Sequence, residues 1–197
     1  MLWMITDVTR TPSVAATVES IVRFGRVGLL RVTIRPEGLF SDEDLRTVVA
    51  EILAKCPRLE VFIRGEPASA RRCGAAGLHL RSSSLGRVVA VRAAAPDLFI
   101  AVSAHSPTEF EQAFTDGADY VFYSPVFPPL SKPYDQRPTV APVKREGLYL
   151  LGGIDRSRAE RLIRQGFVNL AAVSLFYSQT AVNDVEYLLR LMQEVSP

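Results

Sequence analysis

Residues 119–132 read DYVFYSPVFPPLSK and combine a strand signal with a shaped loop. The first six residues are rich in aromatic and branched side chains, which favours a β-strand. The prolines that follow cannot continue a strand ladder, so the chain must leave the sheet there. Ser131 and Lys132 then place a hydroxyl and an ammonium beyond the carboxyl end of the strand, which suits a bound phosphate or diphosphate. The alternative is an exposed proline-rich connection with a solvated lysine, since most exposed lysines bind nothing specific.

Similar strand patterns recur along the whole chain, with helical patterns between most of them. The candidate strands are residues 2–6, 28–34, 59–63, 77–80, 98–103, 120–123, 148–151 and 170–175. Eight strands alternating with helices predict a closed α/β barrel, a single (β/α)8 TIM-barrel domain over residues 1–197. An open doubly wound sheet is the alternative architecture. Residues 131–146 contain prolines and lack apolar periodicity, so we expect the helix after the sixth strand to be shortened to a turn or two.

The predicted helices are recognised by the spacing of their apolar residues and by capping residues at their ends. The predicted helices with the clearest signals are residues 42–55, 107–116, 156–165 and 182–195. The first has apolar residues at three-four spacing, with Ser41 as its N-cap and Asp44 three residues later. Ser106 is the expected N-cap of the second helix, and Gly166 ends the third.

Composition limits the class of protein. The 197 residues are 48% hydrophobic and 22% charged, as in ordinary globular domains. A net charge of +2 is too small to indicate binding to nucleic acid or to an acidic membrane surface. Cys56 and Cys73 have neither metal-type nor redox-type spacing, which favours a reduced, cytoplasmic protein. No apolar run reaches the roughly 18 residues of a membrane span, and we read no signal peptide. A homo-oligomer is compatible with the sequence.

The chemistry of a TIM barrel lies on the loops at the carboxyl ends of its strands. Gly152 and Gly153 follow the seventh strand, where paired glycines let backbone N–H groups approach an anion. Ser174 lies at the end of the eighth strand, so we expect these three residues to bind phosphate. An ordinary tight turn is the alternative for the glycines. His105 falls at the predicted mouth as a ligand contact, whereas His79 lies within a strand and is expected to be a hydrogen-bonded core residue.

The order of motifs resembles the thiamine phosphate synthase and TenI family. The matching motifs are WMITD at 3–7, GLHL at 77–80, VSAHS at 102–106, DYV with PVF-P-x-x-S-K in 119–132, GGI at 152–154 and AVS at 172–174. The resemblance covers most of the chain and implies a TIM barrel. Synthases of this family join a hydroxymethylpyrimidine diphosphate to a thiazole phosphate with the help of Mg²⁺ and release diphosphate. TenI-type members lack that activity, and some isomerise a thiazole carboxylate phosphate.

The resemblance implies roles for individual residues. Arg35 is the one residue retained from a Gln-x-Arg-x-Lys pattern on the second strand, so it is expected to clasp diphosphate with help from the nearby Arg31. The alternative for Arg35 is a pair with Glu37. The expected catalytic residues are Arg35, His105 and Lys132, and the expected phosphate-binding residues are Ser131, Lys132, Gly152, Gly153 and Ser174.

The sequence departs from the family at the metal site. Synthases carry an Asn-Asp pair and a further Asp after the third strand, and an acidic pair after the fourth. This chain has Arg64-Gly65-Glu66-Pro67-Ala68 and Arg81-Ser82-Ser83-Ser84 at those places. Mg²⁺ prefers carboxylate oxygens, and Glu66 by itself could not hold it, so no metal-ligating residue is predicted, although Mg²⁺ stays open as a cofactor. The candidate diphosphate-binding residues are Arg31, Arg35, Arg64 and Arg81.

Three functions remain open. The first is an enzyme of thiamine biosynthesis, synthase-like or tautomerase-like, that binds a small phosphorylated ligand. The tautomerase reading lacks its expected histidine, because Pro125 stands at that position. The second is a non-catalytic protein that binds a phosphorylated thiamine-pathway ligand. The third is another phosphate-handling barrel isomerase, which would share the glycine pair but not the PVF…SK stretch.

Overall fold

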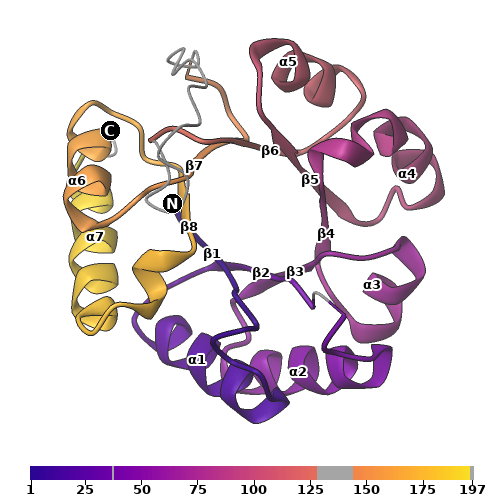
Figure 1. Ribbon diagram of the computed structural model, residues 1–197, viewed down its shortest axis with the longest axis horizontal. Helices are drawn as coiled ribbons and strands as arrows, with labels where there is room; N and C mark the ends of the chain where they lie inside the picture. The colour runs from indigo at the N-terminus through magenta and orange to yellow at the C-terminus, as the bar shows by residue number, and fades with distance from the viewer. Residues whose placement is uncertain (37, 128–143, 196–197) are drawn as a thin grey trace.

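The computed structural model describes residues 1–36, 38–127 and 144–195. Eight parallel strands close into a barrel in sequence order, and β8 pairs with β1 (Figure 1). The strands are β1 Leu2–Ile5, β2 Arg31–Ile34, β3 Glu60–Ile63, β4 Gly77–Leu80, β5 Phe99–Ala104, β6 Tyr120–Tyr123, β7 Leu148–Leu151 and β8 Leu170–Ala172. The predicted TIM barrel is therefore confirmed, and the open sheet is excluded.

Helices cover the outside of the barrel (Figure 1). They are α1 Val14–Arg26, α2 Asp42–Lys55, α3 Pro67–Cys73, α4 Val88–Ala94, α5 Pro107–Thr115, α6 Arg156–Arg164 and α7 Ala181–Val195, with 3-10 turns η1 Ser82–Arg87 and η2 Ser174–Tyr177. The sequence predicted strand eight to run to residue 175, but the strand ends at Ala172 because a 3-10 turn begins at Ser174. The shortened helix expected after β6 falls mainly on residues outside the described ranges.

Capping explains where the helices begin. Ser41 accepts a hydrogen bond from the backbone of Asp44, and the Asp44 carboxylate accepts one from the backbone of Ser41. This capping box satisfies two backbone donors that the helix itself leaves unpaired. Ser106 caps α5 in the same manner, through the backbone N–H of Glu109. Both N-caps are those that the sequence predicted.

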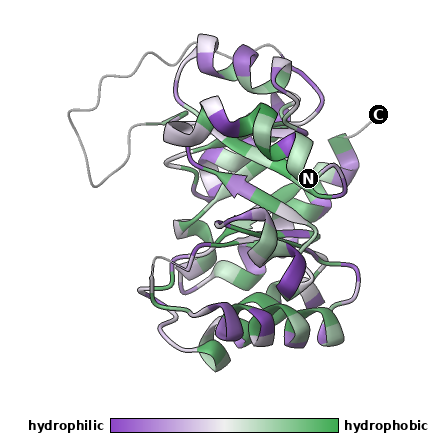
Figure 2. Ribbon diagram, turned by 90° about the vertical axis from the view of Figure 1, so that its right-hand side faces the viewer, coloured by the Kyte–Doolittle hydropathy of each residue, from purple (hydrophilic) through white to green (hydrophobic). Residues whose placement is uncertain are grey.

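Alternation along the strands divides the buried side chains into two groups. One group fills the barrel interior: Trp3, Ile5, Phe62, Ala101, Phe122, Tyr149 and Ala171. The other group faces the helices and includes Met4, Ile34 and Ile63. Successive residues of a strand point to opposite faces. Hydrophobic colours follow the central strands in Figure 2, whereas the helices around them are mixed.

Two further observations concern the described part of the chain. Cys56 and Cys73 are both buried and free of disulfide bonds. Among the described helices, none is long and apolar enough to cross a membrane.

Candidate functional site

Polar residues follow the carboxyl ends of β2 to β6, at positions where the alternation of the strand directs side chains towards the inside of the barrel. Thr33, Phe62, His79, Ser103 and Phe122 face the barrel interior by the alternation of β2 to β6. The residues that lie two positions further along are Arg35, Arg64, Arg81, His105 and Ser124. Because side chains alternate with a period of two, these five residues leave their strands towards the mouth of the barrel.

A cavity of about 540 Å³ opens on the β7, β8, β1 and β2 side of this mouth. Its lining residues are Arg10, Arg35, Leu151, Gly152, Gly153, Ile154, Asp155, Arg158, Ala172, Val173 and Ser174. The fold thus brings together four residues that the sequence predicted for anion binding. Ser131 and Lys132, predicted to join them, lie outside the described residues.

The glycine pair has a conformation and a close neighbour that both require glycine. Gly152 has φ +103° and Gly153 has φ +63°. A Cβ on Gly152 would lie 2.7 Å from Cα of Pro125, and one on Gly153 would lie 3.0 Å from the carbonyl oxygen of Phe127. The loop after β6 is held against this turn, because Phe127 N–H donates to the Gly152 carbonyl at 3.2 Å. The glycines therefore serve the packing of two loops, in addition to any role with an anion.

Two arginines of the cavity were missed by the sequence reasoning. Arg158 lies in the first turn of α6, and its Nη1 donates to the Gly153 carbonyl at 2.7 Å. Arg10 lies in the loop after β1, 3.3 Å from the Asp7 carboxylate and above the ring of Tyr177. Both follow strand ends, so the rule that barrel chemistry lies on these loops could have selected them. The sequence prediction considered mainly glycines and hydroxyl side chains on these loops and therefore did not include Arg10 and Arg158.

Arg35 is fixed at the edge of the cavity by β1. Its Nε donates to the carbonyl of Thr6 at 2.6 Å, and its backbone N–H donates to the Thr6 hydroxyl at 3.0 Å. Asp7 follows Thr6 in the chain. The hydrogen bond from the Thr9 hydroxyl lowers the pKa of the Asp7 carboxyl, and the charges of Arg35 and Arg10 lower it by smaller amounts. The carboxylate of Asp7 is therefore ionised and offsets part of the positive charge of the cavity.

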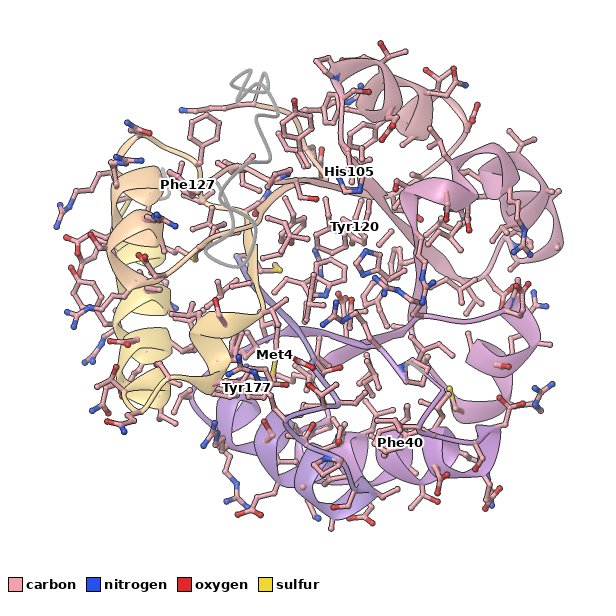
Figure 3. All side chains as sticks on the ribbon, viewed as in Figure 1. Met4, Phe40, His105, Tyr120, Phe127 and Tyr177 are labelled. Atoms are coloured by element: carbon pink, nitrogen blue, oxygen red, sulfur yellow. The ribbon has the colours of Figure 1, made fainter. Side chains whose placement is uncertain are left out.

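His105 follows β5 at the mouth, beside the end of β6 (Figure 3). Its Nδ1 lies 2.7 Å from the carbonyl oxygen of Ser124, which can only accept, so Nδ1 carries a proton. Its backbone N–H donates to the Glu109 carboxylate at 2.7 Å. These two hydrogen bonds fix the orientation of the ring at the mouth.

His79 is a core residue, as the sequence predicted. Its side chain is buried, with Nε2 2.9 Å from the Ser103 hydroxyl and Nδ1 3.3 Å from the Thr33 hydroxyl. The ring stacks on Phe122 at 4.4 Å. Burial lowers the pKa of His79 well below its usual 6.5, and the charges of Arg64 and Arg35 lower it further. His79 is therefore neutral in the folded protein near neutral pH.

Because His79 is neutral in the folded protein, we expect the folded protein to lose stability in mild acid. The unfolded chain binds a proton at His79 below pH 6.5, whereas the folded chain does not, so stability falls as the pH falls. We expect the free energy of unfolding in urea to drop by about 1.4 kcal/mol for each pH unit below 6.5. In His79→Gln this dependence should largely disappear. An unchanged slope in the variant would contradict the assignment.

Comparisons with known proteins identify the family of this chain. The sequence matches the family described as thiamine monophosphate synthase, TMP-TENI, over residues 2–176. The chain belongs to this family. A thiamine-phosphate synthase of Neisseria meningitidis serogroup B is 29% identical over 174 residues, which cover 82% of this chain and 83% of that protein. A thiamine-phosphate synthase of Gloeobacter violaceus is 37% identical over 109 residues, which cover 51% of this chain and 31% of that protein.

A solved structure shows the same fold as this member of the thiamine monophosphate synthase family. Thiamine phosphate pyrophosphorylase from Pyrococcus furiosus superimposes with a TM-score of 0.80 at 22% identity, covering 100% of this chain and 96% of that one. The family resemblance read from the sequence motifs is confirmed by the family match over residues 2–176.

The structure corrects one residue of the predicted site. Arg31 begins β2 and therefore lies at the amino end of the barrel, opposite Arg35. Its Nε is 2.5 Å from the Glu60 carboxylate, and its Nη1 is 2.7 Å from the Tyr149 hydroxyl. Burial raises the pKa of Tyr149 to about 12, so its hydroxyl stays neutral. The expectation that Arg31 assists Arg35 in binding diphosphate is wrong, because Arg31 lies at the first residue of β2 and Arg35 beyond its last.

The carboxylates that the family resemblance implies for magnesium would follow β3 and β4. No group of three or more His, Cys, Asp or Glu side chains among the described residues could hold a metal ion. Glu66, the carboxylate left after β3, is held by both terminal nitrogens of Arg87 at 3.0 and 2.7 Å. The described residues therefore do not fit a magnesium site.

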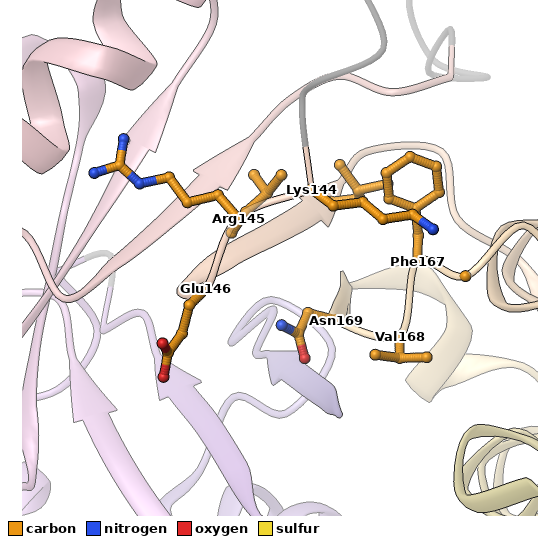
Figure 4. Close-up of a pocket in the computed structure, with 9 residues that line it drawn as sticks. Lys144, Arg145, Glu146, Phe167, Val168 and Asn169 are labelled. Atoms are coloured by element: carbon orange, nitrogen blue, oxygen red, sulfur yellow. The ribbon is translucent and has the colours of Figure 1, made fainter. Parts of the chain in front are cut away.

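A second cavity, of about 290 Å³, lies away from the mouth (Figure 4). Residues that precede β7 and β8 line it together with Leu148 and Leu150 of β7, so it lies towards the amino ends of these strands. Lys144 stands over the ring of Phe167, with Nζ 5.4 Å from the ring centre. None of the predicted site residues lines this cavity.

Proposed function

We propose that this chain is an enzyme of thiamine biosynthesis that binds phosphorylated thiazole or pyrimidine intermediates at the mouth of its barrel. The observation that carries the proposal is the cavity that gathers Arg35, Gly152, Gly153 and Ser174 in a member of the thiamine monophosphate synthase family. Arg10 and Arg158 add two guanidinium groups to the same cavity. Guanidinium forks and glycine-turn N–H groups are both suited to phosphate oxygens.

The proposed reaction is a transfer between two phosphorylated rings. A bond forms between the thiazole and the pyrimidine methylene carbon, while the carbon–oxygen bond to diphosphate breaks and its electron pair leaves on diphosphate. Catalysis requires stabilisation of the charge that develops on this leaving group. Arg35 is the proposed contact for diphosphate, and His105 and Lys132 complete the proposed catalytic set.

A non-catalytic binding protein is the second candidate. The observation that favours it is the loss of the family's carboxylates, with Glu66 engaged by Arg87. Such a protein would keep the phosphate cavity and release its ligand unchanged. The tautomerase reaction has less support, because Pro125 occupies the position of its expected histidine.

Calorimetric titration separates these functions. Thiazole phosphate, pyrimidine diphosphate and thiamine phosphate are each titrated into the protein, with and without Mg²⁺. The proposed enzyme binds both substrates and forms thiamine phosphate when they are mixed. Binding without product formation supports the non-catalytic protein, and absence of binding by all three ligands would contradict both.

The glycine turn offers a direct test of the proposed phosphate site. We expect Gly153→Ala to weaken thiamine phosphate binding at least tenfold, because a Cβ would be 2.9 Å from Cβ of Phe127 and would displace the loop that borders the cavity. Gly74→Ala is the matched control. Gly74 has a similar φ of +74°, but a Cβ there would have no neighbour within 4 Å. Equal affinities in folded Gly153→Ala and Gly74→Ala proteins would place the phosphate site elsewhere.

A further inference from the structure

The side chain of Arg158 joins the turn after β7 to the loop after β6. Arg158 lies in the first turn of α6, and its Nη1 donates to the Gly153 carbonyl at 2.7 Å. Its guanidinium carbon stands 5.0 Å from the centre of the Phe127 ring, which lies beside α6 (Figure 3). Because Gly153 follows β7 and Phe127 follows β6, one side chain of α6 contacts both loops.

Protein groups hold the Arg158 guanidinium from several sides. Asp155, the N-cap of α6, accepts from the backbone N–H of Arg158 at 2.8 Å, and its carboxylate lies 3.7 Å from Arg158 Nε. The face of the guanidinium lies over the Phe127 ring, an arrangement that attracts a cation to the ring. The side chain lines the cavity of the proposed site, but its charge and one of its edges are already used within the protein.

Both carbonyl groups of the glycine pair are held from the β6 and α6 side of the turn. The Gly152 carbonyl accepts from the backbone N–H of Phe127 at 3.2 Å, and the Gly153 carbonyl accepts from Arg158. Phe127 does not line the cavity, so the Gly152 carbonyl points away from it. Glycine allows many backbone conformations, and a pair of glycines therefore needs partners of this kind to keep one of them.

The held carbonyl groups determine where two N–H groups of the turn point. In a trans peptide unit the carbonyl and the N–H point in opposite directions, and both units here are trans. The N–H of Gly153 therefore points away from β6, towards β8 and Ser174, and the N–H of Ile154 points away from Arg158. Neither N–H has a hydrogen-bond partner among the described residues, so both are available to an anion in the cavity.

We propose that Arg158 is a positioning residue, which acts on the ligand phosphate through the glycine pair and not by direct contact. This inference rests on the proposed function. By holding the Gly153 carbonyl, Arg158 prevents rotation of that peptide unit, which would turn a carbonyl oxygen into the cavity in place of an N–H donor. A carbonyl oxygen accepts hydrogen bonds and repels a phosphate oxygen. A turn that is already in its binding conformation loses less free energy when the ligand binds.

Titration calorimetry with thiamine phosphate measures the effect on binding. We expect Arg158→Met to weaken binding roughly tenfold, the effect of losing one hydrogen bond to a charged group. Arg161→Met is the matched control and should keep the original affinity. Arg161 also stands over the Phe127 ring, at 5.1 Å, but it does not line the cavity and has no bond to the turn among the described residues. Unchanged affinity in Arg158→Met, or equal losses in the two variants, would overturn the proposal.

Backbone amide NMR signals distinguish positioning from direct contact. In the ligand-free protein, we expect Arg158→Met to move the amide signals of Gly153 and Ile154 and to leave that of Gly74 in place. Weaker binding with unchanged amide signals would overturn the proposal, because Arg158 would then be a direct ligand of the phosphate.

Phe127→Leu is a second variant, should Arg158→Met fold poorly. It removes the ring beneath the guanidinium and keeps the charge of Arg158. A positioning role predicts weaker thiamine phosphate binding and moved Gly153 and Ile154 signals in this variant. Unchanged affinity and unchanged signals would contradict that role.

Failure of this inference is distinguishable from failure of the proposed function. If thiamine phosphate binds and responds to Gly153→Ala but not to Arg158→Met, the positioning role is overturned and the proposed function stands. If no phosphorylated thiamine ligand binds, the proposed function fails, and the amide signals of the ligand-free protein still decide whether Arg158 holds the turn.

Discussion

Thiamine phosphate formation by this protein is expected to be roughly 100- to 1000-fold slower than in a metal-dependent synthase of the same family, and EDTA should not change its rate. The reaction depends on stabilising the departing diphosphate, and loss of one group that does so reduces the rate by about this factor. The family resemblance implies carboxylates for magnesium where this chain has Gly65 and Ser83, and Glu66 is paired with Arg87. A steady-state assay with both substrates measures this rate.

Restoring the acidic positions should reverse the metal dependence. Gly65 accepts a side chain, because a Cβ there would meet only ordinary contacts, with Cδ1 of Ile63 at 3.4 Å. We expect the combination of Arg64→Asn, Gly65→Asp and Ser83→Asp to gain a Mg²⁺-stimulated rate that the unmodified protein lacks. Rapid turnover by the unmodified protein that a chelator abolishes would show that this interpretation of the missing carboxylates is wrong.

Trp3→Ala is expected to lower the free energy of unfolding by about 3–5 kcal/mol, the usual range for a large aromatic residue in a core. The Trp3 ring is fully buried and lies within 5.3 Å of four aromatic rings, contributed by β3, β6 and β7. Its indole N–H also donates to the Thr33 hydroxyl at 3.0 Å. Removing this side chain empties the centre of the barrel and leaves a buried hydroxyl with one partner fewer.

Urea unfolding of Trp3→Ala and Phe99→Ala measures this contribution. Phe99 is the matched control, because it stands at the amino rim of the same aromatic group and is 41% exposed. Its removal should cost less than half as much as the removal of Trp3. Similar losses in the two variants would show that the interior is not organised around Trp3.

Local patterns were enough to predict most of the architecture. The alternation of apolar runs and helical periods predicted eight strands and a closed barrel, because each period reflects which face of an element is buried. Ser41 and Ser106 were found as N-caps because capping depends on residues within three positions of each other. The departure of the metal positions from the family pattern was inferred from the sequence alone and stays a prediction.

The candidate site was only partly predictable, because its members come from distant segments. Gly152, Gly153, Ser174 and Arg35 were selected one by one as residues after strand ends, and the closed barrel brought them to one cavity. Arg10 and Arg158 have no motif of their own. Their relevance depends on the contacts of Arg158 with the Gly153 carbonyl and of Arg10 with Asp7.

The sequence by itself determined the strand count, the helix caps and the family, because these depend on nearest neighbours and on motif order. Only the tertiary structure decided to which end of the barrel each arginine belongs. Arg31 begins β2 and Arg35 follows its last residue, yet the first contacts Glu60 and Tyr149 at the amino end while the second borders the cavity. A strand rises about 3.3 Å per residue, so four residues span the barrel from one end to the other.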